Sequence, residues 1–172
     1  MNFIKNLFNR DIYKTRFELI EDRGNGFYSW NGTIYKSDIV RACIRPKVKA
    51  VGKLIPQHIR NNNVEGFKVN PEVYIRFLYE EPNPYMSGQV FREKMATQLA
   101  LNNNAFALLV RDENGYPIEM YNIPCTAVEA IYNSIGELFL KFTNRNGKVV
   151  TYPYKDIIHI RQDINENDIF GR

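Results

Sequence analysis

AFALLVRDENGYPIEMYNI, residues 105–123, carries the clearest structural signal in this 172-residue sequence. Residues 105–110 form a nearly continuous apolar run, which is typical of a central β-strand. Asn114 and Gly115 both tolerate a positive φ, so the pair predicts a tight turn. Residues 118–123 should then return beside the first run, and we expect a β-hairpin here.

Four further strands are predicted toward the C-terminus. Asn146-Gly147 is a second Asn-Gly pair and predicts another hairpin turn. Residues 154–156 are expected to form a short turn before the last strand. The four predicted strands cover residues 127–132, 138–143, 148–152 and 157–161.

The sequence before the hairpin shows helical spacing instead. Ser37 is a suitable N-cap, and apolar residues then recur at three- and four-residue steps as far as Ile55. Pro46 lies inside this segment and should kink or split the helix. Two more helices are expected over residues 71–81 and 87–101. The predicted buried stripes are Ile39, Val40, Cys43, Ile44, Val48, Val51, Leu54 and Ile55, then Val73, Phe77 and Leu78, then Val90, Phe91, Met95 and Leu99.

Helices followed by antiparallel strands define an α+β domain, with N-terminal helices packed on one face of a mostly antiparallel sheet. We place this domain at residues 37–172. Residues 1–36 are expected to form an N-terminal arm, whose start suits a short helix packed on its own or a neighbouring subunit. Three aromatic residues of the arm, Phe27, Tyr28 and Trp30, need burial either under the domain or in a partner.

The formal net charge is +4, a mild bias that a solvated surface explains. Lys47, Lys49 and Lys53 fall on the exposed side of the first helix. Together with Arg60 they define one alternative, a nucleic-acid-binding module. No segment suits a signal peptide or a membrane span, so no membrane partner is expected. Two cysteines outside any C-x-x-C arrangement fit a reducing compartment.

Catalytic side chains are scarce. The two histidines are His58, which precedes an Asn-rich loop expected at residues 61–66, and His159, which lies in a strand pattern. Cys43 falls on the helical stripe and is expected in the core, whereas Cys125 lies in a turn. A Cys125–His159 pair would make a small α+β enzyme, which is the second alternative. No third group stands at a recognisable spacing, so we expect His159 to be a structural histidine and expect no catalytic residue.

Metal and cofactor sites are not expected either. Two scattered histidines and two scattered cysteines do not make a four-ligand zinc set. The acidic segment at residues 163–168 lacks the central Gly and terminal Glu of an EF-hand loop. No glycine-rich phosphate loop occurs. The sequence therefore predicts a protein that is not an enzyme and holds no cofactor.

Several local patterns, taken together, carry a family resemblance. They are SWNG at residues 29–32, DIVRAC at 38–43, KLIP at 53–56, FL at 77–78, EPNPYMS at 81–87, NAFALL at 104–109, RD at 111–112, NG at 114–115, YNIP at 121–124 and DIIHIR at 156–161. Their order and spacing resemble the N-terminal part of tailed-bacteriophage portal proteins. One departure is Asn103, where that family usually has a glycine.

The resemblance implies a structural virion component. The full-length protein would form a homo-oligomeric ring at one capsid vertex, through which DNA is packaged and ejected. The capsid, the terminase motor and the head–tail connector would be its partners, and ATP hydrolysis would belong to the motor. Its location would be the virion, and the host cytoplasm during assembly.

The resemblance also bears on the parts of this chain. Family members continue into stem, clip and crown segments, so we expect a truncated chain that covers the arm and most of the outer wing. The DNA tunnel would lie in the missing segments, so direct DNA binding by this part is not expected. The wing would supply subunit contacts, and we place Phe27, Tyr28 and Trp30 in such a contact.

Overall fold

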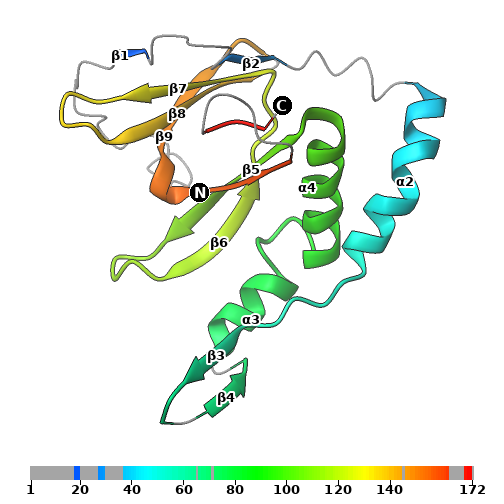
Figure 1. The fold of residues 1–172 in the computed structure, drawn as a ribbon, viewed down its shortest axis with the longest axis vertical. Helices are drawn as coiled ribbons and strands as arrows, with labels where there is room; N and C mark the ends of the chain where they lie inside the picture. Colours follow the sequence, from blue (N-terminus) through cyan, green and yellow to red (C-terminus); the bar gives the residue numbers. More distant parts are fainter. Residues whose placement is uncertain are drawn as a thin grey trace.

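The computed structural model describes residues 18–19, 27–29, 37–64, 66–70, 72–144, 146–162 and 169–171, the first two ranges for their backbone alone. The described elements alternate between short strands and helices before a run of longer strands (Figure 1). They are β1 (Glu18–Leu19), β2 (Phe27–Ser29), α2 (Asp38–Gly52), β3 (Ile59–Asn62), β4 (Gly66–Val69), α3 (Val73–Glu80), α4 (Gly88–Asn102), β5 (Asn104–Arg111), β6 (Pro117–Asn122), β7 (Ala127–Tyr132), β8 (Leu138–Thr143), β9 (Val149–Pro153), a 3₁₀ turn (Tyr154–Asp156) and β10 (Ile157–Arg161).

The described strands pair antiparallel and are divided among three sheets. One sheet has the order β1-β7-β8-β9, with β2 also paired to β7. The second has the order β10-β5-β6, and the third is the β3–β4 hairpin. The predicted α+β class is confirmed. The predicted strands from residue 105 onward are also confirmed, within one residue at each end.

Strand β5 lies at the centre of the fold because both of its faces are buried. Phe106 points into one core cluster, beside Leu140 and Phe142 of β8. Its neighbours Ala105 and Ala107 point into a second cluster under α3 and α4. The continuous apolar run of the sequence reflects this double burial. Small alanines on the helix side let α4 pack closely on the strand.

The β5–β6 turn uses one positive φ rather than two. Gly115 has φ 84°, whereas Asn114 is not among the residues with a positive φ. The Asp112 side chain stabilises the turn, because its Oδ1 accepts hydrogen bonds from the backbone N–H groups of Asn114 at 2.9 Å and Tyr116 at 2.7 Å. Asp112, at the start of the turn, therefore contributes to the turn stability that we attributed to the Asn-Gly pair alone.

Two features of helix α2 can be compared with its prediction. It is a single helix that contains Pro46, so of the two effects expected of the proline, a kink or a split, the split does not occur. The proline removes one N–H donor, and the exposed backbone around Ala42 can satisfy the freed carbonyl with water. The predicted buried stripe is wrong in part, because only Val48 and Gly52 are buried. Four of its members are exposed instead: Ile39, Cys43, Leu54 and Ile55.

The segment between α2 and α4 projects from the rest of the domain (Figure 1). Leu78 of α3 is buried as predicted, but Val73 and Phe77 are exposed. The loop expected at residues 61–66 is part of the β3–β4 hairpin, whose described residues are all exposed. Asparagines have a low β-propensity, so composition alone pointed to a loop. Pairing of Ile59 with Val69 sets the strand register instead.

Candidate assembly surface

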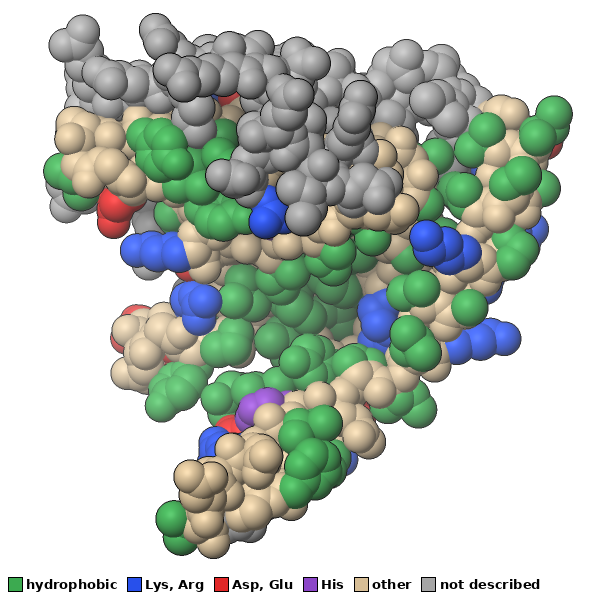
Figure 2. Space-filling view, in the orientation of Figure 1, with side chains coloured by type: hydrophobic (Ala, Val, Ile, Leu, Met, Phe, Trp, Pro, Cys, Tyr) green, Lys and Arg blue, Asp and Glu red, His purple; other side chains and the backbone are tan. Residues whose placement is uncertain are grey.

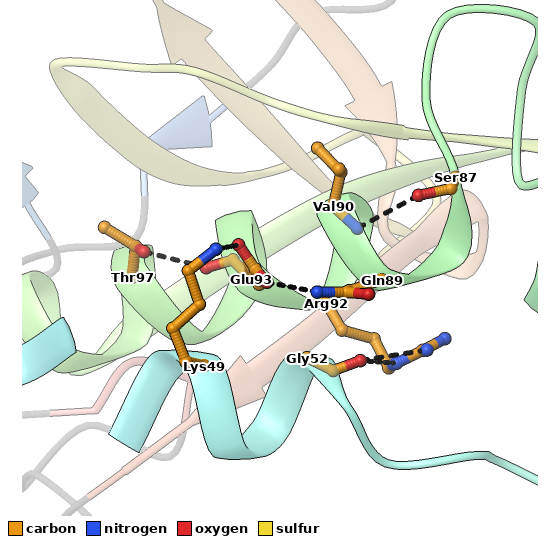
Figure 3. A network of polar contacts seen from close by, with 8 residues as sticks. All are labelled: Lys49, Gly52, Ser87, Gln89, Val90, Arg92, Glu93 and Thr97. Atoms are coloured by element: carbon orange, nitrogen blue, oxygen red, sulfur yellow. Dashed lines mark hydrogen bonds and ion pairs between the residues drawn. The ribbon is translucent and has the colours of Figure 1, made fainter. Parts of the chain in front are cut away.

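Helix α4 is the element that holds α2 and α3 in place. Its N-cap is Ser87 as predicted, and the Ser87 hydroxyl accepts a hydrogen bond from the Val90 N–H at 3.5 Å (Figure 3). Glu93 faces α2, where its Oε2 lies 2.7 Å from Lys49 Nζ. Gln89 donates to the other Glu93 oxygen at 2.9 Å. The Lys49 ammonium and the Gln89 amide lower the pKa of the Glu93 carboxyl, so it is ionised and paired at neutral pH.

Arg92 joins the ends of two helices. Its Nη2 and Nε donate to the Gly52 carbonyl of α2 at 3.1 and 3.3 Å (Figure 3). Its Nη1 donates to the Tyr79 carbonyl of α3 at 3.2 Å. Carbonyls at a helix C-terminus lack intrahelical partners and carry partial negative charge. One planar guanidinium therefore satisfies two helix ends at once and fixes the position of α2 relative to α3.

A groove of about 1000 Å³ lies between α2, α4 and the end of β6. Its lining includes the apolar side chains of Ile44, Val90 and Ile123, and Val90, which we predicted to be buried, is exposed. Four basic and two acidic side chains also line it, and the acids Asp38 and Glu93 pair with Arg41 and Lys49. Arg45 and Lys94 have no carboxylate partner among the described residues. The groove therefore offers apolar contact area together with positive charge.

The opposite face of α2 is apolar and exposed. Ile39, Cys43, Pro46 and Ala50 follow one another at three- and four-residue steps, and all four are exposed. Ile39 is the extreme case, with 76% of its surface accessible. In the part of Figure 2 that corresponds to α2, hydrophobic and basic side chains alternate on the surface. A helix that is apolar on a solvent-facing side typically packs on a partner.

Helix α2 also carries the net charge of the chain. Residues 38–53 hold five basic side chains, Arg41, Arg45, Lys47, Lys49 and Lys53, against one acid, Asp38. Their balance of +4 equals the formal charge of the whole sequence, so the other residues sum to zero. Two of these basic groups are paired, since Arg41 contacts Asp38 and Lys49 contacts Glu93.

The structure gives each member of the predicted Cys/His alternative its own environment. Neither His159 ring nitrogen is available to a thiol, because Nδ1 lies 3.2 Å from the Tyr154 hydroxyl and Nε2 lies 3.1 Å from Asn104 Oδ1. An amide oxygen can only accept, so Nε2 carries the proton and Tyr154 donates to Nδ1. Cys125 is buried in the core, which raises the pKa of its thiol to about 12. The His159 ring is hydrogen-bonded through both nitrogens and the Cys125 thiol is buried, so neither side chain is placed to act as a base or a nucleophile.

His159 is itself held neutral by its surroundings. The ring stacks on Phe106 with a centroid distance of 4.5 Å and an interplanar angle of 26°. Burial, with a smaller contribution from the Arg161 charge, lowers the pKa of His159 to about 4. A histidine that is neutral and hydrogen-bonded on both nitrogens at physiological pH fits the structural role that we expected for it.

The remaining predicted residues lie apart from one another. Cys43 is on the exposed face of α2, so the prediction of a core cysteine is wrong. His58 Nδ1 lies 2.8 Å from Glu72, which also pairs with Arg60, at the base of the β3–β4 hairpin. Lys47, Lys49 and Lys53 are exposed as predicted.

Some predictions fall outside the described residues. These are Trp30, the side chains of Phe27 and Tyr28, and the acidic segment 163–168. Within the described ranges, no group of three or more acidic, His or Cys side chains could hold a metal ion. The described helices include none that is long and apolar enough to cross a membrane.

Asn104 is a site residue that sequence reasoning missed. Its side chain is fully buried, and its amide donates to the carbonyls of Asn102 at 3.0 Å and Gly171 at 2.9 Å. Its Oδ1 accepts from the Gly171 N–H at 2.7 Å, in addition to His159. This side chain therefore ties residues 169–171 to the start of β5. The available signal was a polar residue at the head of an apolar run.

The chain is an α+β domain with an open groove on one flank and a concentration of basic charge on one helix. The comparisons with known proteins identify its family. The family model described as "phage portal protein" matches residues 38–172, so the chain belongs to the phage portal protein family, a family of structural virion components.

Individual relatives agree with the family match. The chain is 30% identical over 86 residues to the portal protein of Enterobacteria phage HK97, which covers 50% of this chain and 20% of that protein. A chain in the neck of an empty GTA particle aligns with a TM-score of 0.64 at 15% identity, over 80% of this chain and 37% of that one. A chain in the virion of a native gene transfer agent (GTA) particle aligns with a TM-score of 0.62 at 15% identity, over 81% and 36%. The chain thus spans about a fifth to two fifths of the length of these proteins, and the solved structures support its fold.

Proposed function

We propose that this chain is the arm and wing portion of a portal subunit, which assembles with copies of itself into a ring at one capsid vertex. Its contribution is geometric and non-covalent: it positions the subunit and supplies contacts to its neighbours. The observation that carries the proposal is the family match over residues 38–172, the same residues that present the groove and the exposed face of α2. Two relatives by fold come from particle necks computed with C6 and C12 symmetry, which supports a ring.

The partners of the ring follow from the same proposal. The capsid, the terminase and the head–tail connector would dock on the assembled ring in the virion, and DNA would pass through it. We do not expect this portion to bind DNA strongly by itself, because two of its α2 cations are already paired with carboxylates. The reacting groups for ATP hydrolysis would belong to the motor.

Ring formation by the complete protein tests this function. Purified protein should give closed rings in electron micrographs and a single high-mass species in mass photometry. A protein that stays monomeric over the micromolar range, under conditions in which it is folded, would contradict the proposal.

The aromatic residues of the arm belong to the same proposal. Phe27 and Tyr28 lie in β2, which pairs with β7 at the edge of the wing, and Trp30 follows directly. We propose that these three side chains contact a neighbouring subunit. Replacing Trp30 with Ala should weaken ring formation while circular dichroism shows an unchanged fold. Rings of unchanged stability would remove Trp30 from the contact.

A further inference from the structure

The groove between α2 and α4 has no occupant among the described residues, and its chemistry restricts what can fill it. The apolar part of the lining requires an apolar surface in contact with it. Arg45 and Lys94 are exposed and have no carboxylate partner among the described residues, so a partner with negative charge would gain by pairing with them. At about 1000 Å³ the groove is wider than one side chain needs, which favours a projecting loop or turn.

The turn of the β5–β6 hairpin has the complementary properties. The turn itself, residues 112–116, contains the acids Asp112 and Glu113 and no base, and Glu119 follows in β6. Arg111 precedes the turn and donates to the Gly115 carbonyl at 3.0 Å. Tyr116 and Ile118 are each more than half exposed, at 55% and 52%. The turn is rigid for its size, because Asp112 accepts two backbone hydrogen bonds within it. It is thus an acidic projection with two large apolar side chains and little conformational entropy to lose on docking.

The groove and the turn lie on opposite flanks of the molecule. In Figure 1, α2 is on the right of the domain and the tip of the β5–β6 hairpin is on the left. Two complementary patches on opposite flanks make a head-to-tail contact, and such contacts generate rings when the rotation closes. We propose that the β5–β6 turn of one copy docks in the α2–α4 groove of the next. This inference rests on the proposed ring and assigns the surfaces that form it.

Two other occupants fit the charges less well. Residues 1–36 of the same chain hold six bases and four acids, so the arm brings further positive charge to a basic rim. Nucleic acid would satisfy the charge of Arg45 and Lys94. It would leave the apolar part of the lining at Ile44, Val90 and Ile123 in contact with a polar phosphate backbone. An acidic, apolar protein turn satisfies both requirements.

A charge swap in the complete protein tests the contact. Arg45→Glu should raise the concentration at which half of the subunits are in rings by about tenfold, and Glu113→Arg should do the same. The double variant should return to within about twofold of the wild type, because the attraction is restored with reversed signs. Lys47→Glu is the matched control, since Lys47 lies on the same helix but does not line the groove, and it should leave assembly unchanged.

Cross-linking then tests the geometry directly. In a Cys43→Ser background, Arg45→Cys and Glu113→Cys are introduced on separate copies and mixed under oxidising conditions. We expect disulfide-linked pairs that contain one of each variant. Pairs of a cysteine at position 45 with a second cysteine at 45 would indicate a symmetric contact and overturn the inference.

The possible failures are distinguishable. If the wild-type protein forms rings but no variant weakens them and no mixed cross-link appears, this contact is wrong and the proposed function stands. If the wild type forms no rings, the proposed function itself fails. If Arg45→Glu abolishes salt-dependent DNA binding without changing assembly, the groove serves nucleic acid. If a cysteine at position 45 cross-links within its own chain to one in the arm, the arm fills the groove. Each of the last two results would overturn the inference.

Discussion

Asn104 and His159 show how a few buried polar groups join distant parts of the chain. Asn104 lies between the end of α4 and residues 169–171, and its side chain satisfies backbone groups from both sides. His159 completes the cluster by donating to the same amide oxygen. Gly171 is required here, because a Cβ would overlap the backbone oxygens of Gln162 and Asn103. The cluster therefore depends on residue identity at each of its positions.

Replacing Asn104 with Ala should destabilise the fold by about 2–4 kcal/mol. The substitution leaves the buried Gly171 N–H and the partly buried His159 Nε2–H without their acceptor. Urea denaturation would measure the loss. Asn61→Ala is the matched control, because Asn61 is exposed on β3, and it should change the stability by less than about 0.5 kcal/mol. Equal effects of the two substitutions would mean that the buried cluster is not important for stability.

The low pKa of His159 makes the stability depend on pH in a defined window. The imidazole takes up a proton with a pKa near 6.5 when the chain is unfolded but only near 4 when it is folded. The unfolded state thus binds more protons between these values, so stability should fall as the pH drops from 6.5 to 4 and level off below. Because His159 is only partly buried, we expect a loss of about 1–2 kcal/mol.

The His159→Leu variant isolates this contribution. The difference in unfolding free energy between the wild type and the variant should be constant above pH 6.5 and shrink toward pH 4. Urea titrations at a series of pH values would measure it. A difference that does not vary with pH would show that His159 has the same proton affinity in both states.

At the scale of elements, close backbone approach determines how the helices meet. The α3–α4 contact has no room at Gly88, where a Cβ would overlap the Tyr79 carbonyl oxygen. The α2–α4 contact at Gly52 is looser, because a Cβ there would meet the flexible side chain of Glu93. Arg92 then connects both junctions through its hydrogen bonds to Gly52 and Tyr79. The position of α2, and hence of the groove, depends on these contacts with α4.

Gly88→Ala should therefore destabilise the protein by about 1–3 kcal/mol, although alanine has the higher helix propensity. The added methyl group must move the backbone of α3 or α4. Gly52→Ala serves as the comparison, and its cost should stay below about 1 kcal/mol because the Glu93 side chain can rotate away. Thermal unfolding of the two variants would measure the order. A larger effect at Gly52 would mean that the side chains around Glu93 are more rigid than the backbone at Tyr79.

At the scale of the whole molecule, charge is distributed unevenly between the two flanks. The basic excess lies on α2, and the β5–β6 turn at the other flank is acidic. If the proposed head-to-tail contact forms the ring, each interface has an attractive electrostatic component on top of apolar burial. The same uneven charge distribution would orient approaching copies before contact.

Ring assembly should consequently weaken with salt. Raising the ionic strength from about 0.1 M to about 1 M shortens the Debye length from about 10 Å to about 3 Å. We expect the concentration at which half of the subunits are in rings to rise several-fold, as measured by mass photometry. An Arg45→Gln variant should show a smaller salt dependence than the wild type, because one interfacial charge is already missing. Equal salt dependence in both proteins would place Arg45 outside the interface.

The amino-acid order was sufficient to predict the α+β class, the strands from β5 onward and the N-cap of α4, because these follow from local periodicity and turn chemistry. It also led us to expect a structural role for His159, since no partner groups stood at a catalytic spacing. Local periodicity did not predict which of the apolar residues are buried. Cys43 and Val48 belong to one periodic pattern, yet only Val48 faces α4.

Burial on α2 depends on where α4 stands, and that is set by contacts between residues distant in sequence, such as Lys49 with Glu93. The groove is lined by residues of both helices, and α2 lies nearer to α4 at its C-terminal end than at its N-terminal end (Figure 1). Likewise, Asn104 gains its role from residues 169–171, more than sixty positions away. Periodicity records which side of an element is apolar. Only the packed chain shows whether that side meets its own core or remains open to a partner.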